Sequence, residues 1–535
     1  MGQKYRKRMN CATFFGIFFG ILQKNCIFAL KYYNCTRKRG LTIDIDMKRF
    51  LHNLMICSML LTMSMTMSSC LTTMGLMLIW LDDDEPQQQQ EMPVEKIYSD
   101  FKYEVTSMKK GNLDGDFINK LTMKGNGSGI QYTSSDPSVA SVDPSGRVDI
   151  LTTGTTTITA TIEDHDNYIY NQHTASYTIL VVEGFTYVQY NTTSKEFETV
   201  VLSTDDDYEA FPAPPASGDV TLNDAKPYIV KESVTVNGDL VLGANTKIVL
   251  VDGFTLKVNG AVRGTSHTLT VYGQTWQNSI GLLDVKASSY EAIQASSIYL
   301  HSTYVLAEAT GSQRKGFYVH DNFGIYGSIV QGQGGPGANG HGIYVDDSGD
   351  HTCQLNIVSS LVSGIGGNNS EGNGGSGIFY AGSADLVVAG NTIVSAQGGN
   401  VSGGYDDQAG DGLKLLDYPN IVLDGGTLYL HGGRNTKRSA NFSGSDRFTK
   451  DGHGLYLRDK DNSTEGRRYI VYKGGYMLVE YDNHSKEGGE VFNARMSNES
   501  GENVSFYDNN TKYNLNKGSK SQTWNTPYVK MPAEW

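Results

Sequence analysis

A tetrad that opens on glycine recurs five times between residues 316 and 480 of this chain. The copies begin at positions 316, 342, 377, 412 and 454, so the intervals between them are 26, 35, 35 and 42 residues. Short alternating strands and turns follow each copy, and helical spacing is nearly absent. Repeats of this kind indicate a solenoid, in which each unit buries its apolar face on its neighbours. We therefore predict a right-handed parallel β-helix, a scaffold whose regular outer ladders favour polymers, and polysaccharide first. The five tetrads are Gly316-Phe317-Tyr318-Val319, Gly342-Ile343-Tyr344-Val345, Gly377-Ile378-Phe379-Tyr380, Gly412-Leu413-Lys414-Leu415 and Gly454-Leu455-Tyr456-Leu457.

Strand alternation assigns the two faces of every tetrad. The second and fourth residues of each tetrad should point inward, and the third should point outward. Four of the five outward residues are aromatic, and two interpretations stay open. The rings form a platform that stacks on sugar rings, or they form a cross-strand ladder that stabilises the solenoid. We call these residues the outward row: Tyr318, Tyr344, Phe379, Lys414 and Tyr456.

A Gly-Gly pair precedes four of the tetrads, at positions 334, 366, 398 and 432. From the second glycine of each pair to the next tetrad, the distance grows from 7 (335 to 342) through 10 (367 to 377) and 13 (399 to 412) to 21 residues (433 to 454). These insertions should leave the solenoid at the same corner of every turn, beside the outward row. Long loops gathered on one face are usually functional.

Alternating strands also fill the region before the tetrads, from Tyr228 onward. We expect this opening run to cap the solenoid and the segment Trp524–Trp535 to cover its other end, because an open β edge invites aggregation. Residues 227–535 are then one β-helix domain with a C-terminal cap, and residues 184–226 are a connector.

The charge of the chain is unevenly distributed. Residues 1–70 carry 11 Lys and Arg against 2 Asp and Glu, which leaves 33 (44 − 11) against 55 (57 − 2) for the remainder. Such an acidic body repels phosphate backbones, so we expect no nucleic-acid partner. Only one of the six cysteines, Cys353, lies beyond residue 70, which excludes a disulfide framework. Cys353 lies in an alternating run and should be a buried small residue.

The N-terminal region reads as a bacterial export signal from Met47 onward. Lys48 and Arg49 precede an apolar stretch that ends in Met67-Ser68-Ser69-Cys70. Small residues before a cysteine resemble a lipobox, which implies lipidation of Cys70 in a protein at the bacterial outer membrane or cell surface. The alternative is an uncleaved membrane span, since residues 54–81 are long enough and nearly all apolar or small. Residues 47–81 are then the anchor, residues 82–94 a polar tether and residues 1–46 an upstream extension.

Residues 95–183 hold short alternating strands separated by turn residues. The runs YTSSDPSVASVD (132–143) and GTTTITAT (154–161) predict a β-sandwich. They resemble the bacterial Ig-like group 2 family, which implies a spacer or adhesive stalk on a surface protein. The expected core residues are Val139, Val142, Val148, Ile158 and Ala160. The predicted fold class is therefore all-β, an Ig-like β-sandwich followed by a right-handed parallel β-helix.

The runs GDGLKLL (410–416) and NIVLDGGTLYL (420–430) resemble a family of clostridial carbohydrate-binding β-helix proteins. The resemblance implies a β-helix that binds calcium and an acidic or cellulosic plant polysaccharide. Asp411 and Asp451 match the loop acid of that family and are the expected metal ligands. We expect Gly340 and Gly375 to hold the same position in the other coils, which would break a regular calcium ladder.

Paired acids, Asp346-Asp347 and Asp406-Asp407, raise the alternative of a polysaccharide lyase or glycoside hydrolase that acts on acidic polysaccharide. The signatures Asn-Thr-Asp and Arg-Ile-Lys of polygalacturonases are missing, and the two Gly-His-Gly runs belong to the repeat. Because a fold alone does not license an activity, we favour a non-catalytic protein that binds glycan. An adhesin that recognises protein is a further alternative.

Overall fold

The computed structural model describes residues 96–532 apart from 126, 166, 276–279, 347–352, 404–406, 417–418, 437–450, 458–468, 481–494, 509–510 and 520–528. The chain divides into two compact units, residues 1–93 and 94–535, and the described residues belong to the second. Cys70 and the predicted signal, anchor, tether and upstream extension lie outside the described residues. The part of the chain that is described contains strands and no helix, and so none that is long and apolar enough to cross a membrane.

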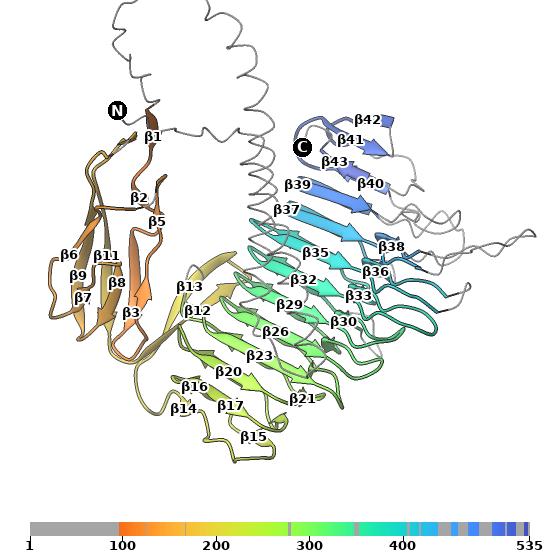
Figure 1. The fold of residues 1–535 in the computed structure, drawn as a ribbon, viewed down its shortest axis with the longest axis horizontal. Helices are drawn as coiled ribbons and strands as arrows, with labels where there is room; N and C mark the ends of the chain where they lie inside the picture. The colour runs from red at the N-terminus through yellow and green to blue at the C-terminus, as the bar shows by residue number, and fades with distance from the viewer. Residues whose placement is uncertain are drawn as a thin grey trace, which may run out of the picture. The chain divides into compact units, whose positions relative to one another are not determined.

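The first part of this unit is the Ig-like β-sandwich (Figure 1). A four-stranded sheet and a three-stranded sheet enclose a core in which Val148, Ile158 and Ala160 are fully buried and Val139 nearly so, while Val142 is half-buried. The predicted core is therefore confirmed, with Val142 at its edge. In sheet order, the strands are β3 (Ser107–Gly111), β11 (Thr174–Val182), β9 (Gly154–Thr161) and β6 (Gln131–Ser134), then β4 (Phe117–Ile118), β8 (Arg147–Ile150) and β7 (Ala140–Val142), with the small pairs β1 (Ile97–Ser99) and β10 (Tyr168–Tyr170), and β2 (Lys102–Tyr103) and β5 (Leu121–Thr122).

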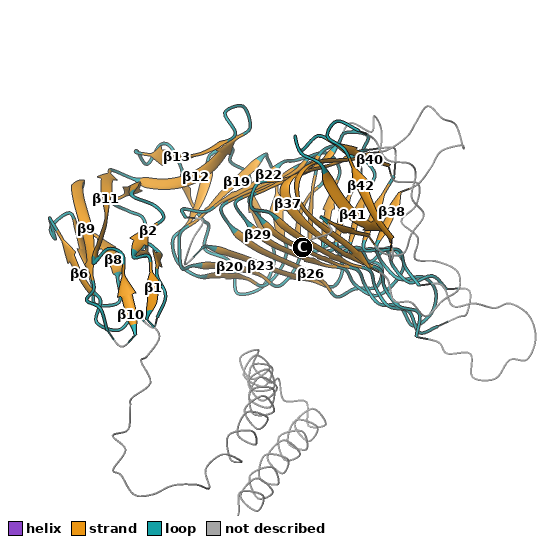
Figure 2. Ribbon diagram, turned by 90° about the horizontal axis from the view of Figure 1, so that it is seen from above, coloured by secondary structure: helices purple, strands orange, loops and turns teal. Residues whose placement is uncertain are grey.

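The second part is a right-handed parallel β-helix, in which each coil contributes one strand to each of three columns (Figures 1 and 2). Column A holds β14 (Glu209–Ala210), β16 (Pro227–Val230), β19 (Thr246–Leu250), β22 (Leu269–Tyr272), β25 (Ile298–His301), β28 (Phe323–Tyr326), β31 (Leu355–Val358) and β34 (Leu386–Ala389). Column B holds β17 (Val234–Val236), β20 (Thr255–Val258), β23 (Leu282–Ala287), β26 (Tyr304–Ala309), β29 (Ile329–Gln333), β32 (Leu361–Ile365) and β35 (Ile393–Gln397). The long strands β37 (Ile421–His431) and β39 (Tyr469–Glu480) continue both columns.

Column C is a separate nine-stranded sheet that contains the five tetrads. Its strands are β15 (Val220–Leu222), β18 (Leu240–Leu242), β21 (Val262–Gly264), β24 (Ile293–Ala295), β27 (Phe317–Val319), β30 (Ile343–Val345), β33 (Ile378–Tyr380), β36 (Leu413–Leu415) and β38 (Leu455–Leu457). The predicted inward residues from Phe317 to Leu455 are at most 1 % exposed, which confirms the alternation, and the side chain of Leu457 lies outside the description. Cys353 is also fully buried, as predicted.

The opening run from Tyr228 forms the first coils of the β-helix, as its period-2 strands predict. Its strands β16 and β19 pair in parallel with the coils that follow, and its residues belong to the same continuous core. At the other end, β40 (Arg495–Asn498) extends column A, and β41 (Val504–Asp508), β42 (Thr511–Leu515) and β43 (Val529–Met531) add antiparallel strands.

The segment after the sandwich forms an antiparallel hairpin, β12 (Phe185–Asn191) and β13 (Glu196–Leu202). The hairpin packs its aromatic side chains on column A. Tyr187 lies 4.3 Å from Tyr272, and Tyr190 stacks on Tyr326 at 4.7 Å between ring centres. The backbone N–H of Tyr190 also donates to Nδ1 of His301, at 3.1 Å. The hairpin is therefore part of the outer layer of the β-helix.

Two stacks of glycine meet at the corner between columns B and C. The second glycines of the Gly-Gly pairs face Gly340, Gly375 and Gly410, and the backbones exchange hydrogen bonds, as from Gly399 N to Gly375 O at 2.8 Å. A Cβ on Gly375 would lie 2.1 Å from the carbonyl oxygen of Gly340. No side chain fits there, so the repeated glycines clamp the base of each loop that leaves the corner.

Candidate functional site

The outward row lies in strict register along column C. Tyr318 pairs with Tyr344, Tyr344 with Phe379, Phe379 with Lys414 and Lys414 with Tyr456. Each of the five residues is half-buried. Because neighbouring strands are roughly 4.8 Å apart, the row is a continuous file of side chains parallel to the axis of the solenoid.

The rings at the centre of the row stack on one another. The ring centres of Tyr344 and Phe379 are 4.7 Å apart at 29° between planes, and the imidazole of His341 stacks on Tyr344 at 5.2 Å. Tyr318 meets Tyr344 edge to face at 5.1 Å. The faces of the central rings are therefore taken by neighbours, and the row presents ring edges. For these rings the face-stacking mode of sugar binding is not open, and the cross-strand ladder describes them better.

Two lysines complete the packing of the row. Nζ of Lys315 lies 4.9 Å from the ring centre of Tyr318 and 5.0 Å from that of Tyr344. Nζ of Lys414 lies 5.6 Å from Phe379 and 5.1 Å from Tyr456. Cation–π contacts of this kind hold the ammonium groups beside the ring faces. Lys414 therefore continues the row of aromatic side chains, because its ammonium group contacts the rings of Phe379 and Tyr456 on either side.

Polar groups line the flank of the row. The hydroxyl of Tyr344 donates to Oδ2 of Asp346 at 2.6 Å. Burial raises the pKa of Tyr318 above its usual range, and the charges of Asp346 and Glu291 raise it further. His320 lies 4.1 Å from the ring of Tyr318, and its Nε2 is 2.9 Å from the amide nitrogen of Gln294. The flank therefore offers phenol, carboxylate and imidazole groups within reach of one ligand.

His341 is buried behind the row and remains neutral. Its Nδ1 accepts a hydrogen bond from the backbone N–H of Ser376 at 3.0 Å. Burial lowers the pKa of His341 to about 3, and the positive charges of Lys315 and Lys414 contribute to the lowering. The neutral imidazole contacts both rings, with its centre 5.2 Å from that of Tyr344 and 4.9 Å from that of Phe379.

The two predicted metal ligands lie in different environments. Asp411 is in register with His453, whose Nδ1 is 2.8 Å from Oδ1 of Asp411, and Nζ of Lys414 is 3.7 Å from Oδ2. Asp451 is fully buried and accepts a hydrogen bond from the backbone N–H of Asn435 at 2.8 Å. Among the described residues, no group of three or more His, Cys, Asp or Glu is placed to hold a metal ion. Calcium at Asp411 and Asp451 stays a prediction.

The register of the loop acids differs from the sequence-based alignment. Gly340, Gly375, Gly410 and Gly452 stack in succession, one from each coil. They do not share a position with Asp411 or Asp451. The motif alone does not distinguish these positions, because several glycines follow one another at this corner. Asp347 and Asp406 of the acid pairs lie outside the described residues.

A buried ionic cluster joins the Ig-like domain to the β-helix, and no motif in the sequence predicts it. Nζ of Lys110 lies 3.5 Å from Oδ2 of Asp252, and both side chains are inaccessible to solvent. Asp114 accepts hydrogen bonds from the backbone N–H groups of Gly111 and Thr186, at 2.7 and 2.8 Å. Burial raises the pKa of Asp114. The side chain of Gln274 donates to Asp114 and to the carbonyl of Thr186, and it accepts from the N–H of Asp252.

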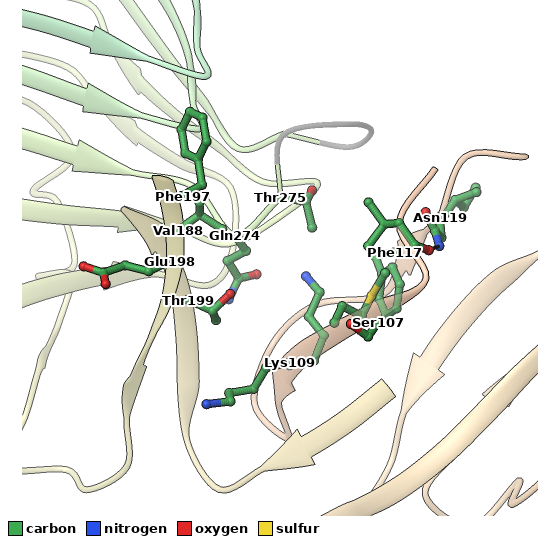
Figure 3. A pocket seen from close by; sticks show the side chains of 14 residues that line it. Ser107, Lys109, Phe117, Asn119, Val188, Phe197, Glu198, Thr199, Gln274 and Thr275 are labelled. Atoms are coloured by element: carbon green, nitrogen blue, oxygen red, sulfur yellow. Dashed lines mark hydrogen bonds between the residues drawn. The ribbon is translucent and has the colours of Figure 1, made fainter. Parts of the chain in front are cut away.

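A pocket of about 190 Å³ opens beside this cluster (Figure 3). Val188, Phe197, Glu198 and Thr199 of the hairpin lie on one side of it, and Ser107, Phe117 and Asn119 of the sandwich on the other. Lys110 also lines the pocket, with its ammonium 4.8 Å from the ring centre of Phe117. The Ig-like domain and the hairpin are apart at the pocket, but they are joined next to it by the ionic cluster of Lys110, Asp114 and Asp252.

Comparison with known proteins identifies one part of the chain. Residues 118–164 match the family described as the intimin immunoglobulin-like domain. No curated protein and no solved structure matches the chain. The matched residues run from β4 to just beyond β9, within the predicted sandwich, and they confirm a bacterial Ig-like domain. The finer resemblances, to Ig-like group 2 and to the clostridial β-helix proteins, stay predictions.

Proposed function

We propose that this protein is a bacterial cell-surface adhesion protein whose β-helix binds a glycan without cleaving it. The similarity of residues 118–164 to the Ig-like domain of intimin supports a surface role. In this proposal the Ig-like domain is a spacer, and the ionic cluster at Lys110 and Asp252 transmits load from the spacer to the β-helix. The acidic body of the chain supports a partner other than nucleic acid.

The observation that carries the proposal is the outward row with its polar flank. A glycan chain presents hydroxyl groups at regular intervals, and the row presents phenol, ammonium and carboxylate groups at the regular interval of the strands. Tyr318, Tyr344 and Asp346 would contact sugar hydroxyls through their oxygen atoms. Lys414 and Tyr456 would extend the contact toward the longer loops.

The anchor is a separate element of the proposal. Cys70, preceded by Ser68 and Ser69, would carry the lipid that holds the protein at the outer membrane or cell surface. Replacement of Cys70 by Ala should abolish metabolic labelling of the protein with a lipid precursor and shift it to the soluble fraction. Unchanged labelling would rule out a lipid at this residue.

A second candidate function is a polysaccharide lyase or hydrolase, which the contact between Asp411 and His453 favours. A carboxylate that holds an imidazole is a common arrangement for proton transfer. Both side chains are at most 8 % exposed, however, and the backbone N–H of His453 also donates to Oδ1 of Asp411. These contacts suit a structural pair better than a catalytic one.

The experiment that tests the proposal is a glycan array probed with the intact protein, with and without calcium. Binding of a defined class of glycan supports the proposal, and a requirement for calcium would support metal ligation by Asp411 and Asp451. Any glycan that binds is then incubated with the protein and assayed for new reducing ends and unsaturated products. Product formation would replace the binding function with the enzymatic one, and an array without binding would refute both.

A further inference from the structure

A furrow runs along the outer face of column B, at the corner where the loops leave. Two cavities of about 300 and 280 Å³ lie in it, and Gln397 lines both of them. The third outward position of every strand forms one wall, in register from Glu308 of β26 to Glu480 of β39. Six strands at about 4.8 Å give the furrow a length of roughly 24 Å.

Glycine forms the floor of the furrow. Gly334, Gly366 and Gly398 line the first cavity, and a Cβ on any of them would lie 2.0 Å or less from a carbonyl oxygen of the facing glycine stack. Their N–H groups donate to the carbonyls of Ile365, Gln397 and His431 in the next coil. The floor is therefore smooth, and its backbone donors are already satisfied, so recognition depends on the walls.

The second wall is a ladder of asparagines with a fixed orientation. Oδ1 of Asn368 accepts a hydrogen bond from the N–H of Asn400 at 2.8 Å, and Oδ1 of Asn400 accepts one from the N–H of Arg434 at 2.8 Å. Each amide oxygen is thereby held in the ladder, which leaves the NH₂ group as the part of the side chain that a ligand can reach. Both asparagines are exposed.

The first wall offers amides that other protein groups do not use. In the described part of the chain, the side chains of Gln333 and Gln397 make no hydrogen bond. Ile365 lies between them in the same row and adds an apolar surface. The amide groups of Gln333 and Gln397, on either side of the apolar Ile365, can donate hydrogen bonds to hydroxyl groups and accept hydrogen bonds from them. An uncharged sugar chain presents such hydroxyl groups together with apolar C–H surfaces.

The charges around the furrow select against a polyanion. Its centre, from Gln333 to Asn400, contains no charged side chain. Glu308 at one end is paired with Lys286 at 2.8 Å, and Glu480 stands at the other end. The body of the chain outside residues 1–70 is also strongly acidic. An acidic polysaccharide would therefore be repelled, and a neutral one would not.

We propose that this furrow is the track for a neutral polysaccharide, which lies parallel to the axis of the β-helix with its hydroxyl groups on Gln333, Gln397, Asn368 and Asn400. The inference rests on the proposed function and names its ligand class and a binding surface distinct from the outward row. The outward row lies on column C and the furrow on column B, so substitutions can address them separately.

The test compares two variants that each add one negative charge to the same coil. Gln397→Glu keeps the shape of the side chain but removes two donors from the furrow, whereas Asn391→Asp places the charge on an exposed residue outside it. Affinity is measured by the retardation of the intact protein in native gels that contain one polysaccharide each. The neutral probes are hydroxyethyl cellulose, arabinoxylan, galactomannan and dextran, and the anionic probes are carboxymethyl cellulose and polygalacturonate.

We expect a neutral probe to retard the protein, Gln397→Glu to weaken that binding by about fivefold or more, and Asn391→Asp to leave it unchanged. If both variants bind the neutral probes as tightly as the parent, the proposal that the furrow binds glycan is wrong. It is also wrong if the protein binds only the anionic probes. If a neutral probe binds and only substitutions in the outward row weaken it, the furrow fails and the proposed function stands. If no glycan binds here or on the array, both fail.

Discussion

Lys110 of the Ig-like domain and Asp252 of the β-helix form an ion pair that is closed to solvent, with 3.5 Å between Nζ and Oδ2. Burial raises the pKa of Asp252 to about 6, although the charge of Lys110 acts in the opposite direction. Above that pH the carboxylate is charged and depends on Lys110 for compensation. The connection between the Ig-like domain and the β-helix therefore contains a buried carboxylate, Asp252, whose charged form is stabilised by Lys110.

Lys110→Met should destabilise the protein by about 3 kcal/mol or more at pH 8, because it leaves a buried carboxylate without its partner. The loss should be smaller at pH 5, where Asp252 can take up a proton. Urea unfolding of the intact chain at the two pH values measures the difference. The double variant Lys110→Met, Asp252→Asn is the control and should be more stable at pH 8 than Lys110→Met alone. Equal stability of the two variants at pH 8 would show that the pair carries no charge.

His341 should make the β-helix sensitive to acid. Its folded pKa of about 3 lies below the unfolded value of about 6.5, so its contribution is complete above pH 6.5 and is lost as the pH falls toward 3. At pH 4.5 the loss should be between about 2 and 3 kcal/mol. His341→Asn retains an acceptor for the N–H of Ser376, so unfolding of this variant should depend less on pH between 6.5 and 4.5. If the unfolding free energy of His341→Asn depends on pH as strongly as that of the parent, a group other than His341 causes the acid sensitivity.

Substitution of the stacked rings should destabilise the solenoid. Because the two rings stack at 4.7 Å, Tyr344→Ala with Phe379→Ala should cost about 1 to 3 kcal/mol. Ile343→Ala should cost about 2 to 5 kcal/mol, since it leaves a cavity in the core. Thermal unfolding measures all three, and a double variant as stable as the parent would mean that the rings do not support each other.

The glycine corner should not tolerate a methyl group. Gly375→Ala would place a Cβ 2.1 Å from the carbonyl oxygen of Gly340, and overpacking of this kind costs about 1 to 3 kcal/mol or prevents folding. Ser402→Ala, an exposed position in a neighbouring loop, is the matched control. Far-UV circular dichroism and the melting temperature report the difference. If Gly375→Ala and Ser402→Ala both have the melting temperature of the parent, the glycines are not needed for the close approach of the backbones.

The sequence predicted most of the fold because strand alternation and the tetrads are local signals. The inward side of column C, from Phe317 to Leu455, followed from alternation alone. The same local signal could not align Asp411 with His453, because the choice among adjacent glycines at the corner depends on contacts between coils.

The candidate sites were predicted only in part, because they depend on how side chains pack between coils. The outward position of Tyr344 could be read from the pattern, but the stacking of its ring on Phe379 could not. The pair of Lys110 with Asp252 joins residues distant in sequence and has no motif. The furrow at Gln397 also joins distant residues, but it has a sequence signal, since an Asn directly follows two of the Gly-Gly pairs, at positions 368 and 400.

The measurement that tests the central claim most directly is the glycan affinity of the double variant Tyr318→Phe, Tyr344→Phe. The two substitutions remove two of the three hydroxyl groups of the outward row but keep the ring stack. Tyr98→Phe on the exposed surface of the Ig-like domain is the control. Affinity is measured with the glycan that binds on the array, and the melting temperature is measured alongside. The account predicts a loss of about threefold to tenfold in affinity at an unchanged melting temperature, and no loss in the control. Full affinity in the double variant would contradict it.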